Sequence, residues 1–319
     1  GAETAEEVNA KVLPWLKSNA TRENYYLHIN YWDAHRCYKM DASWADRFRD
    51  YPVTQSWPDE EAIRTHQSVT GAFTAHRQFQ NDTSPHPLMP GAINDRRDFE
   101  HMITGYDASI AYVDAHVKQV LDELDRQGVL EDAVIVFSAD HGDAFGEHGI
   151  YSDHVNVDEC IHRIPLIIRW PGVTPAHVRS NTFMYNVDYA PTICDLLGMP
   201  IPEDWDGKSY QDNLRGLSGA DREWLVWDGA LYTVQRAVRT KTHLYIKTVD
   251  AWEYNNRSDE ELYDMIADPY ETTNLCDSSP DVLEQCRTIM CDWIDQQKCK
   301  ANWTADPFDA ILEHRKSWR

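Results

Sequence analysis

The clearest pattern of apolar and polar positions lies at residues 96–128, where apolar side chains recur every three or four positions. This spacing predicts one long amphipathic helix that ends near Gly128. The apolar face comprises Ile103, Tyr106, Ile110, Val113, Val117, Val120, Leu121 and Leu124. Shorter apolar runs at residues 134–137 and 163–172 predict strands. A helix followed by a turn and a strand indicates an α/β domain with a largely parallel sheet.

Other segments fill in the predicted order of elements. The chain opens with an amphipathic helix at residues 1–16, and the aromatic and β-branched residues 24–32 predict a buried strand. The elements predicted after these are an irregular region at 40–94 and a short helix within 186–200, then short antiparallel strands at 223–229, 232–240, 242–249 and 261–265, and a helix at 280–298.

These elements predict an α/β fold with a mixed, largely parallel sheet flanked by helices, followed by a smaller antiparallel sheet with a helix. The change of pattern near Gly216 places the predicted boundary between an α/β core domain at residues 1–215 and a C-terminal subdomain at residues 216–319. With 42% hydrophobic residues among 319, the chain can bury a core in each.

Charge narrows the range of partners. The chain has 53 acidic and 30 basic residues, a formal net charge of -23, which repels nucleic-acid phosphates and anionic lipid. Neither nucleic acid nor a membrane is therefore expected as a partner, and an anionic substrate needs a bound cation to reverse the sign locally. The sequence shows no membrane-spanning run and no signal peptide, and its seven cysteines lack zinc-site spacing, so reduced thiols in the cytoplasm are expected.

Candidate chemistry follows two of the predicted strands. Asp140 and His141 come directly after the strand at 134–137, and Gly142 lets the backbone approach a bound group closely. Because ligands bind at the carboxyl ends of strands in open α/β sheets, the pair predicts half a coordination shell for Ca²⁺, Mg²⁺, Mn²⁺ or Zn²⁺. His35 follows the strand at 24–32, where the spacing leaves open whether it is functional or a hydrogen-bonded loop histidine.

Several motifs together resemble the sulfatases of the alkaline-phosphatase superfamily. "VIVFSADHGDAFGEHG" followed by "RIPLIIRWPG" is similar to the family's metal-binding strand and loop. "NVDYAPTICDLLGMP" is similar to a later core segment, and "RAVRTKTHLYIK" with "ELYDMIADPYETTNL" is similar to the C-terminal subdomain. The resemblance covers roughly residues 22–295.

The resemblance implies a role for each matching residue. Asp140 and His141 would bind the active-site divalent ion, usually Ca²⁺ in this family, and this pair of ligands could be empty in the chain alone. His35 would lie near the leaving-group oxygen and act as the general acid. Where the family usually has a lysine that contacts sulfate, this chain has Asp153 and His154. His154 is expected to donate to a sulfate oxygen, while Asp153, His148 and Lys241 are expected to contact the substrate.

Two departures from the family pattern bear on these expectations. The motif around His35 reads Asp33-Ala34-His35-Arg36-Cys37-Tyr38, without the two prolines usual in the family. The Cys-x-Pro-x-Arg or Ser-x-Pro-x-Arg motif, whose first residue becomes the formylglycine nucleophile, does not occur in the sequence, and neither does the strand ending in two aspartates that completes the metal shell. The chain is therefore interpreted as the C-terminal portion of a sulfatase-like protein, inactive on its own, whose exposed sheet edge favours oligomerisation.

For the complete protein the resemblance implies hydrolysis of a sulfate monoester, either of a small molecule or of a carbohydrate. Any export signal would lie outside this segment. One alternative within the superfamily is a phosphonate or phosphodiester hydrolase, which the Asp-His pair and the missing lysine favour. The other alternative is a binding module that kept the fold and lost turnover.

Overall fold

The computed structural model describes residues 3–78 and 86–316 and divides the chain into two compact units. Unit 1 comprises residues 1–133 and 143–153, and unit 2 comprises residues 134–142 and 154–319. Each unit has its own hydrophobic clusters. The predicted boundary between residues 215 and 216 lies inside unit 2, where it stays a prediction.

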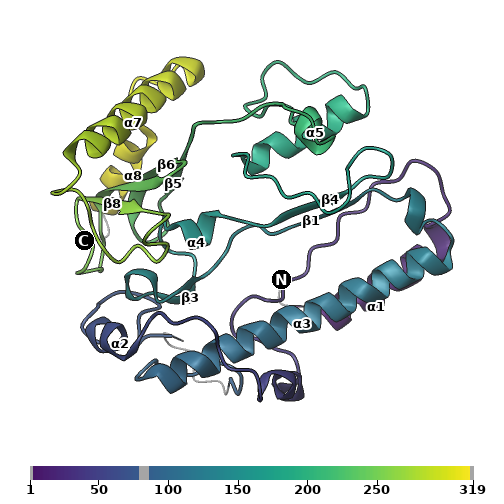
Figure 1. The fold of residues 1–319 in the computed structure, drawn as a ribbon, viewed down its shortest axis with the longest axis horizontal. Coiled ribbons are helices and arrows are strands. Elements are labelled where there is room, and N and C mark those ends of the chain that lie inside the picture. Colours follow the sequence, from purple (N-terminus) through teal and green to yellow (C-terminus); the bar gives the residue numbers. More distant parts are fainter. Residues whose placement is uncertain (1–2, 79–85, 317–319) are drawn as a thin grey trace. The chain divides into compact units, whose positions relative to one another are not determined.

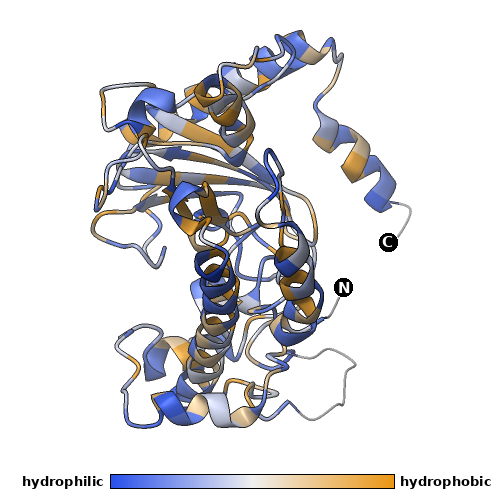
Figure 2. Cartoon of the chain, turned by 90° about the vertical axis from the view of Figure 1, so that its right-hand side faces the viewer, coloured by the Kyte–Doolittle hydropathy of each residue, from blue (hydrophilic) through white to orange (hydrophobic). Residues whose placement is uncertain are grey.

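Unit 1 is built on two helices, α1 (Ala5–Asn19) and the long α3 (Arg96–Arg126) (Figure 1). α1 begins where Thr4 and Glu7 form a capping box. α3 carries both apolar and polar residues along its whole length, as Figure 2 shows, and its buried residues recur with helical spacing. The amphipathic helix predicted from residues 96–128 is therefore confirmed. The other elements of unit 1 are η1 (Ala42–Phe48), α2 (Glu60–His66), η2 (Leu130–Asp132), β2 (Ala144–Phe145), η3 (Glu147–Gly149) and β3 (Tyr151–Asp153).

The buried strand predicted at residues 24–32 is wrong. This segment packs Leu27 and Ile29 against a cluster of α1 and α3 residues, whereas Tyr26 is 78% exposed. A strand requires hydrogen bonds to a neighbouring backbone, and no described residue supplies that neighbour. The aromatic and β-branched composition is typical of a strand, but the described residues do not form the ladder that would bury it.

Unit 2 contains a two-stranded ladder and a four-stranded sheet. β1 (Ile135–Ser138) pairs with β4 (Leu166–Arg169) in antiparallel register, with Ile135 opposite Arg169 and Ser138 opposite Leu166. The α/β class is confirmed, but every ladder among the described residues is antiparallel, so the parallel pairing expected around β1 is not found. Parallel neighbours need a long crossover helix, whereas α4 (Glu159–His162), between β1 and β4, has four residues.

The C-terminal antiparallel sheet is confirmed. Its strands are β5 (Trp224–Gly229), β6 (Val234–Thr240), β7 (His243–Asp250) and β8 (Glu260–Asp264), joined in sequence order. The long helix α7 (Pro280–Ala301) packs Leu283, Cys286 and Met290 against apolar residues of the sheet. Unit 2 is completed by η4 (Asn186–Asp188), α5 (Tyr189–Leu196), α6 (Gln211–Leu214) and α8 (Pro307–Lys316).

A buried arginine ties the C-terminal helices to this sheet. Arg236 on β6 donates to Asp228 on β5 at 2.6 Å and to Asp306, just before α8, at 2.6 Å. Its guanidinium also lies over the rings of Trp293 and Phe308. All seven cysteines are free thiols. In the described ranges, no helix has the length and hydrophobicity that crossing a bilayer requires.

One buried histidine makes the stability of unit 1 depend on pH. Burial lowers the pKa of His66 to about 4, and His66 Nδ1 lies 2.6 Å from the hydroxyl of Tyr151. The unfolded chain therefore binds a proton between pH 6.5 and 4 that the folded unit resists, so stability falls as the pH falls through this window. We expect a loss of about 2–3 kcal/mol, measured by urea unfolding at pH 7 and pH 4.5.

The variant His66→Gln should remove this part of the pH dependence. His76→Gln, at an exposed histidine of the same unit, is the matched control and should keep the wild-type slope. Identical slopes for the two variants would assign the acid sensitivity to other groups.

Candidate metal and substrate site

Asp140 and His141 lie in the turn that follows β1 in unit 2. The Asp140 carboxylate accepts a hydrogen bond from the backbone N–H of His141 at 3.0 Å, which orients it back toward that residue. His141 Nδ1 lies 2.9 Å from the carbonyl oxygen of Gly142. A carbonyl can only accept, so Nδ1 carries the proton and Nε2 carries the lone pair. Nε2 lies 3.9 Å from Asp140 Oδ2, and the Asp140 side chain is 88% exposed.

A divalent cation fits this pair of ligands. A carboxylate oxygen and a neutral imidazole nitrogen are both metal ligands, and the hydrogen bond from Nδ1 fixes the tautomer that leaves Nε2 available. Ligand atoms 3.9 Å apart can both contact one ion, because metal–ligand distances are about 2.0–2.6 Å. Asp140 and His141 could therefore supply two ligands, and their identity does not select among Ca²⁺, Mg²⁺, Mn²⁺ and Zn²⁺.

Gly142 holds this turn against α4. Its backbone N–H donates to the carbonyl of Ile161 at 2.7 Å. A Cβ atom at residue 142 would lie 2.1 Å from the carbonyl oxygen of Cys160, so only glycine allows this approach. The sequence predicts that a bound group approaches the backbone at Gly142. In the structure it is the backbone of α4 that lies against this glycine.

Two more histidines accompany His141 in unit 2. The rings of His141 and His154 have centroids 3.9 Å apart. His162, on α4, stacks on Trp227 with centroids 5.1 Å apart. Burial lowers the pKa of His162, and the charges of His141 and His154 act in the same direction. Unit 2 thus brings the ring of His154 to that of His141, the predicted metal ligand. No sequence pattern indicates the stacking of His162 on Trp227, because one lies in a short helix and the other in a strand.

His35 lies in unit 1, in a loop held by its neighbour. Its Nδ1 lies 2.5 Å from the carbonyl of Arg36, so Nδ1 again donates and Nε2 is the free position. The ring stacks on Trp32 with centroids 4.7 Å apart. Asp33, two residues earlier, accepts from the N–H of Ala5 at 2.7 Å at the start of α1, and burial raises its pKa. Asp33 therefore supports the loop rather than binding a ligand.

Asp153 is the partner of Arg36 in unit 1. The guanidinium donates to Asp153 Oδ2 at 3.0 Å, and the two side chains are 10% and 9% exposed. Arg36 also donates to the carbonyl of Gln78 and lies 4.2 Å from the ring centroid of Phe73. The pair anchors the His35 loop to β3. The predicted contact of Asp153 with substrate stays a prediction.

The other two predicted contact residues are His148 and Lys241. His148 sits in η3 of unit 1, with a left-handed φ of 49°, and its charge contributes to the lowered pKa of His66. Lys241, between β6 and β7 in unit 2, lies 2.9 Å from Asp221 Oδ1 and 3.9 Å from the ring centroid of Phe183. Substrate contact by either residue stays a prediction.

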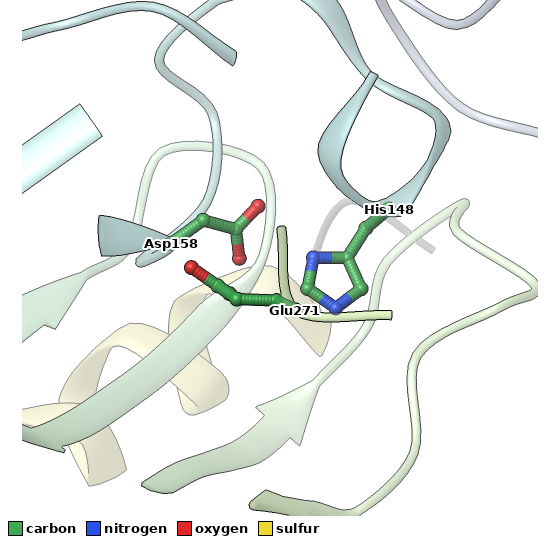
Figure 3. A group of neighbouring side chains, drawn as sticks. All are labelled: His148, Asp158 and Glu271. Atoms are coloured by element: carbon green, nitrogen blue, oxygen red, sulfur yellow. The ribbon is translucent and has the colours of Figure 1, made fainter. Parts of the chain in front are cut away.

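Unit 2 also buries a charged cluster that the sequence did not indicate. Arg257 is fully buried between Asp158, at 3.3 Å, and Glu261, at 3.1 Å. Glu271 belongs to the same interior, and Figure 3 shows its carboxylate near that of Asp158. Glu271 Oε1 accepts from the N–H of Glu159, at the start of α4, at 2.9 Å. These carboxylates support α4 on the C-terminal sheet.

Comparison with known proteins assigns the chain to a family. The family model "Sulfatase" matches residues 4–199, more than half of the chain, and the model "N-sulphoglucosamine sulphohydrolase, C-terminal" matches residues 146–296. The chain belongs to the sulfatase family, within the alkaline-phosphatase superfamily. The resemblance drawn from the sequence motifs is confirmed.

Curated relatives share a limited part of their length with this chain. An N-acetylglucosamine-6-O-sulfatase of Bacteroides thetaiotaomicron is 32% identical over 183 residues, which are 56% of this chain and 32% of that protein. A choline-sulfatase of Rhizobium meliloti is 31% identical over 219 residues, 67% of this chain and 40% of that protein. The chain thus spans about a third to two fifths of the length of these relatives.

Solved structures confirm the fold. A protein in complex with its substrate D-glucosamine-2-N,6-O-disulfate superposes with a TM-score of 0.74 at 19% identity, over 95% of this chain and 71% of that one. A phosphonate monoester hydrolase from Silicibacter pomeroyi superposes with a TM-score of 0.68 at 18% identity, over 96% and 62%. One fold therefore accompanies both chemistries, and the distinction between them must come from the site.

The ion pair between Arg36 and Asp153 should be required for the stability of unit 1. Asp153→Asn leaves a buried guanidinium without its counter-charge, which costs about 3–5 kcal/mol. Asp46→Asn breaks the exposed pair with Arg49 and should cost less than about 1 kcal/mol. Urea unfolding of both variants measures the difference; equal effects would show that the Arg36 pair is not a structural anchor.

The contact between Gly142 and α4 should tolerate no side chain. In Gly142→Ala the new Cβ must displace backbone atoms, so we expect a loss of about 1–3 kcal/mol in unfolding free energy and a shifted His141 ring signal in NMR spectra. Gly172→Ala is the control for backbone strain without a clash, because nothing lies within 4 Å of its Cβ position while its φ is +74°; it should cost about 1–2 kcal/mol and leave the His141 signal in place. An unchanged His141 signal in Gly142→Ala would contradict the positioning role of the glycine.

Proposed function

We propose that this chain forms part of an enzyme that hydrolyses sulfate esters of amino sugars. The observation that carries the proposal is the Asp140–His141 pair, with Nε2 left free beside a carboxylate within the segment that matches the sulfatase family. Two comparisons support the substrate class. One is the relative that is an N-acetylglucosamine-6-O-sulfatase, and the other is the match to the sulphoglucosamine sulphohydrolase model.

In the proposed enzyme, Asp140 and His141 hold a divalent cation, with Ca²⁺ as the expected ion. When bound, the cation neutralises charge on the sulfate oxygens, which a chain of net charge -23 would otherwise repel. His154, next to His141, donates to a sulfate oxygen when it is protonated.

His35 serves the leaving-group side of the reaction. Its Nδ1–H is held by the Arg36 carbonyl, so a proton on Nε2 is the one available to the departing alcohol oxygen. The buried pair of Arg36 and Asp153 keeps the loop in place, so the proton is delivered from a fixed position. The nucleophile is supplied by residues other than these.

The phosphonate alternative keeps the same cation ligands. It is favoured by the His at the second metal position and by the absence of the lysine that sulfatases use for sulfate. The binding-module alternative keeps the cation and loses turnover. Both alternatives differ from the proposal in the substrate that the complete protein consumes.

The test uses the protein encoded by the complete gene and three substrates: N-acetylglucosamine 6-sulfate, p-nitrophenyl sulfate and a phenyl phosphonate monoester. We expect the sugar sulfate to have at least a 100-fold higher kcat/KM than the phosphonate, and activity to be lost with a chelator and restored by Ca²⁺. His35→Ala should lower kcat for the sugar sulfate by about 10²–10⁴. The loss should be under about 10-fold for p-nitrophenyl sulfate, because nitrophenolate leaves without a proton.

His28→Ala, at an exposed histidine of the same segment, is the matched control and should leave both rates unchanged. Equal losses on both sulfates would remove His35 as the general acid. Faster turnover of the phosphonate would replace the sulfatase assignment, and Ca²⁺ binding without turnover of any substrate would establish the binding module.

A further inference from the structure

Charged side chains hold α8, the last described helix of the chain, near both of its ends (Figure 1). Just before its start, Asp306 accepts from Arg236 of β6 at 2.6 Å. Near its end, the side chain of Arg315 is buried, and its guanidinium lies 5.2 Å from the ring centroid of Trp252. α8 lies outside the segments that the two family models match, so the family assignment gives it no role.

Arg315 binds the loop that joins β5 to β6. Its two terminal nitrogens donate to three consecutive backbone carbonyls, those of Ala230 and Leu231 at 3.1 Å and that of Tyr232 at 2.7 Å. Hydrogen bonds from a charged donor are among the stronger ones in proteins. Because one planar group contacts all three carbonyls, it fixes their positions relative to one another and to α8.

The same end of the β5–β6 hairpin holds the segment that follows His154. Thr233, the next residue of the loop, donates through its hydroxyl to the carbonyl of Val155 at 3.3 Å. Trp227 of β5 donates through its indole N–H to the carbonyl of Val157 at 2.9 Å. The backbone directly after His154 is therefore attached to the hairpin at two points, one of which is the loop that Arg315 fixes.

Gln235 sets the direction of the bond from Thr233. With its amide nitrogen toward Thr233, Gln235 donates to the hydroxyl oxygen at 2.7 Å, and its own oxygen accepts from Arg257 Nε at 3.0 Å. The hydroxyl oxygen then accepts from Gln235, so its proton is directed to Val155. Thr233 and Gln235 are fully buried, so bulk water does not compete for this bond.

We propose that Arg315 is a positioning residue for His154. The contacts lead from Arg315 to the loop, from Thr233 to Val155, and from Val155 to the histidine beside it in the chain, whose ring lies 3.9 Å from that of His141. α8 thereby holds in place the group that donates to a sulfate oxygen, without touching the substrate. The effect on turnover rests on the proposed function, whereas the position of His154 is measured without substrate.

The first experiment records the histidine ring signals of the 319-residue chain by NMR. Arg315→Lys keeps the charge but loses the planar fork that reaches three carbonyls. We expect the His154 ring signals to shift, and chymotrypsin to cleave the loop at residues 231–232 about 10-fold faster, because the loop opens more often. Lys316→Met, at the exposed neighbour of Arg315 on the same helix, is the matched control and should change neither readout.

Two variants of Thr233 test the link to the segment after His154. Thr233→Val keeps the shape of the side chain and removes the hydroxyl, so it should shift the His154 ring signals as Arg315→Lys does. Thr233→Ser keeps the hydroxyl and should retain the wild-type signals. Unchanged amide signals of residues 244–246, inside the C-terminal sheet, verify that each variant is folded. If Arg315→Lys lost these amide signals, Thr233→Val would carry the test.

The second experiment measures kinetics in the protein encoded by the complete gene. Arg315→Lys should raise the inhibition constant of inorganic sulfate about 10-fold, and lower kcat/KM about equally for N-acetylglucosamine 6-sulfate and p-nitrophenyl sulfate, because both carry the sulfate that His154 contacts. A loss of folded enzyme would instead lower kcat and leave the inhibition constant unchanged. In a His154→Ala background, Arg315→Lys should change kcat/KM by less than about 2-fold, because the group that it positions is already absent.

Two results would overturn the proposal. The first is an unchanged set of His154 ring signals in folded Arg315→Lys, which would limit the role of α8 to the loop. The second is an equal effect of Arg315→Lys with and without His154, which would assign the effect to other groups. A complete protein that hydrolyses no sulfate ester would contradict the proposed function alone, because the ring signals decide the positioning role without turnover.

Discussion

The candidate cation site depends on one hydrogen bond, from the N–H of Gly142 to the carbonyl of Ile161. This bond seats the turn after β1 on α4 at a distance that excludes a Cβ atom. The same turn fixes the tautomer of His141 through the Gly142 carbonyl, and it places Asp140 beside the free imidazole nitrogen. A short strand, one glycine and a four-residue helix together position the two proposed cation ligands.

Electrostatics explains why such a site needs its cation. A chain with a net charge of -23 repels sulfate at long range, so binding requires local positive charge. The described arginines of both units are largely engaged already, as in the pairs of Arg36 with Asp153 and of Arg257 with Asp158. The exposed Asp140 carboxylate can recruit a divalent ion, which then reverses the local sign.

Much of the fold could be predicted from the sequence because its periods are local. α3, β1 and the C-terminal meander follow from helical spacing or short alternating runs with tight turns. The partner of a strand is a long-range property, so two features could not be predicted: the antiparallel pairing of β1 with β4, and the lack of a ladder partner for residues 24–32 within the described ranges. In the site, Asp140 and His141 were marked by adjacency after a strand, whereas the pairing of Arg36 with Asp153 joins residues 117 positions apart.

The support beneath α4 extends the site into the C-terminal sheet. The N–H of Glu159 donates to Glu271, and the Glu159 side chain pairs with Arg239 on β6. Any substitution that shifts β6 or the segment around Glu271 is therefore transmitted to the helix on which Gly142 rests. Substitutions in the C-terminal sheet could thereby change the cation affinity of such proteins during evolution, while both ligands stay the same.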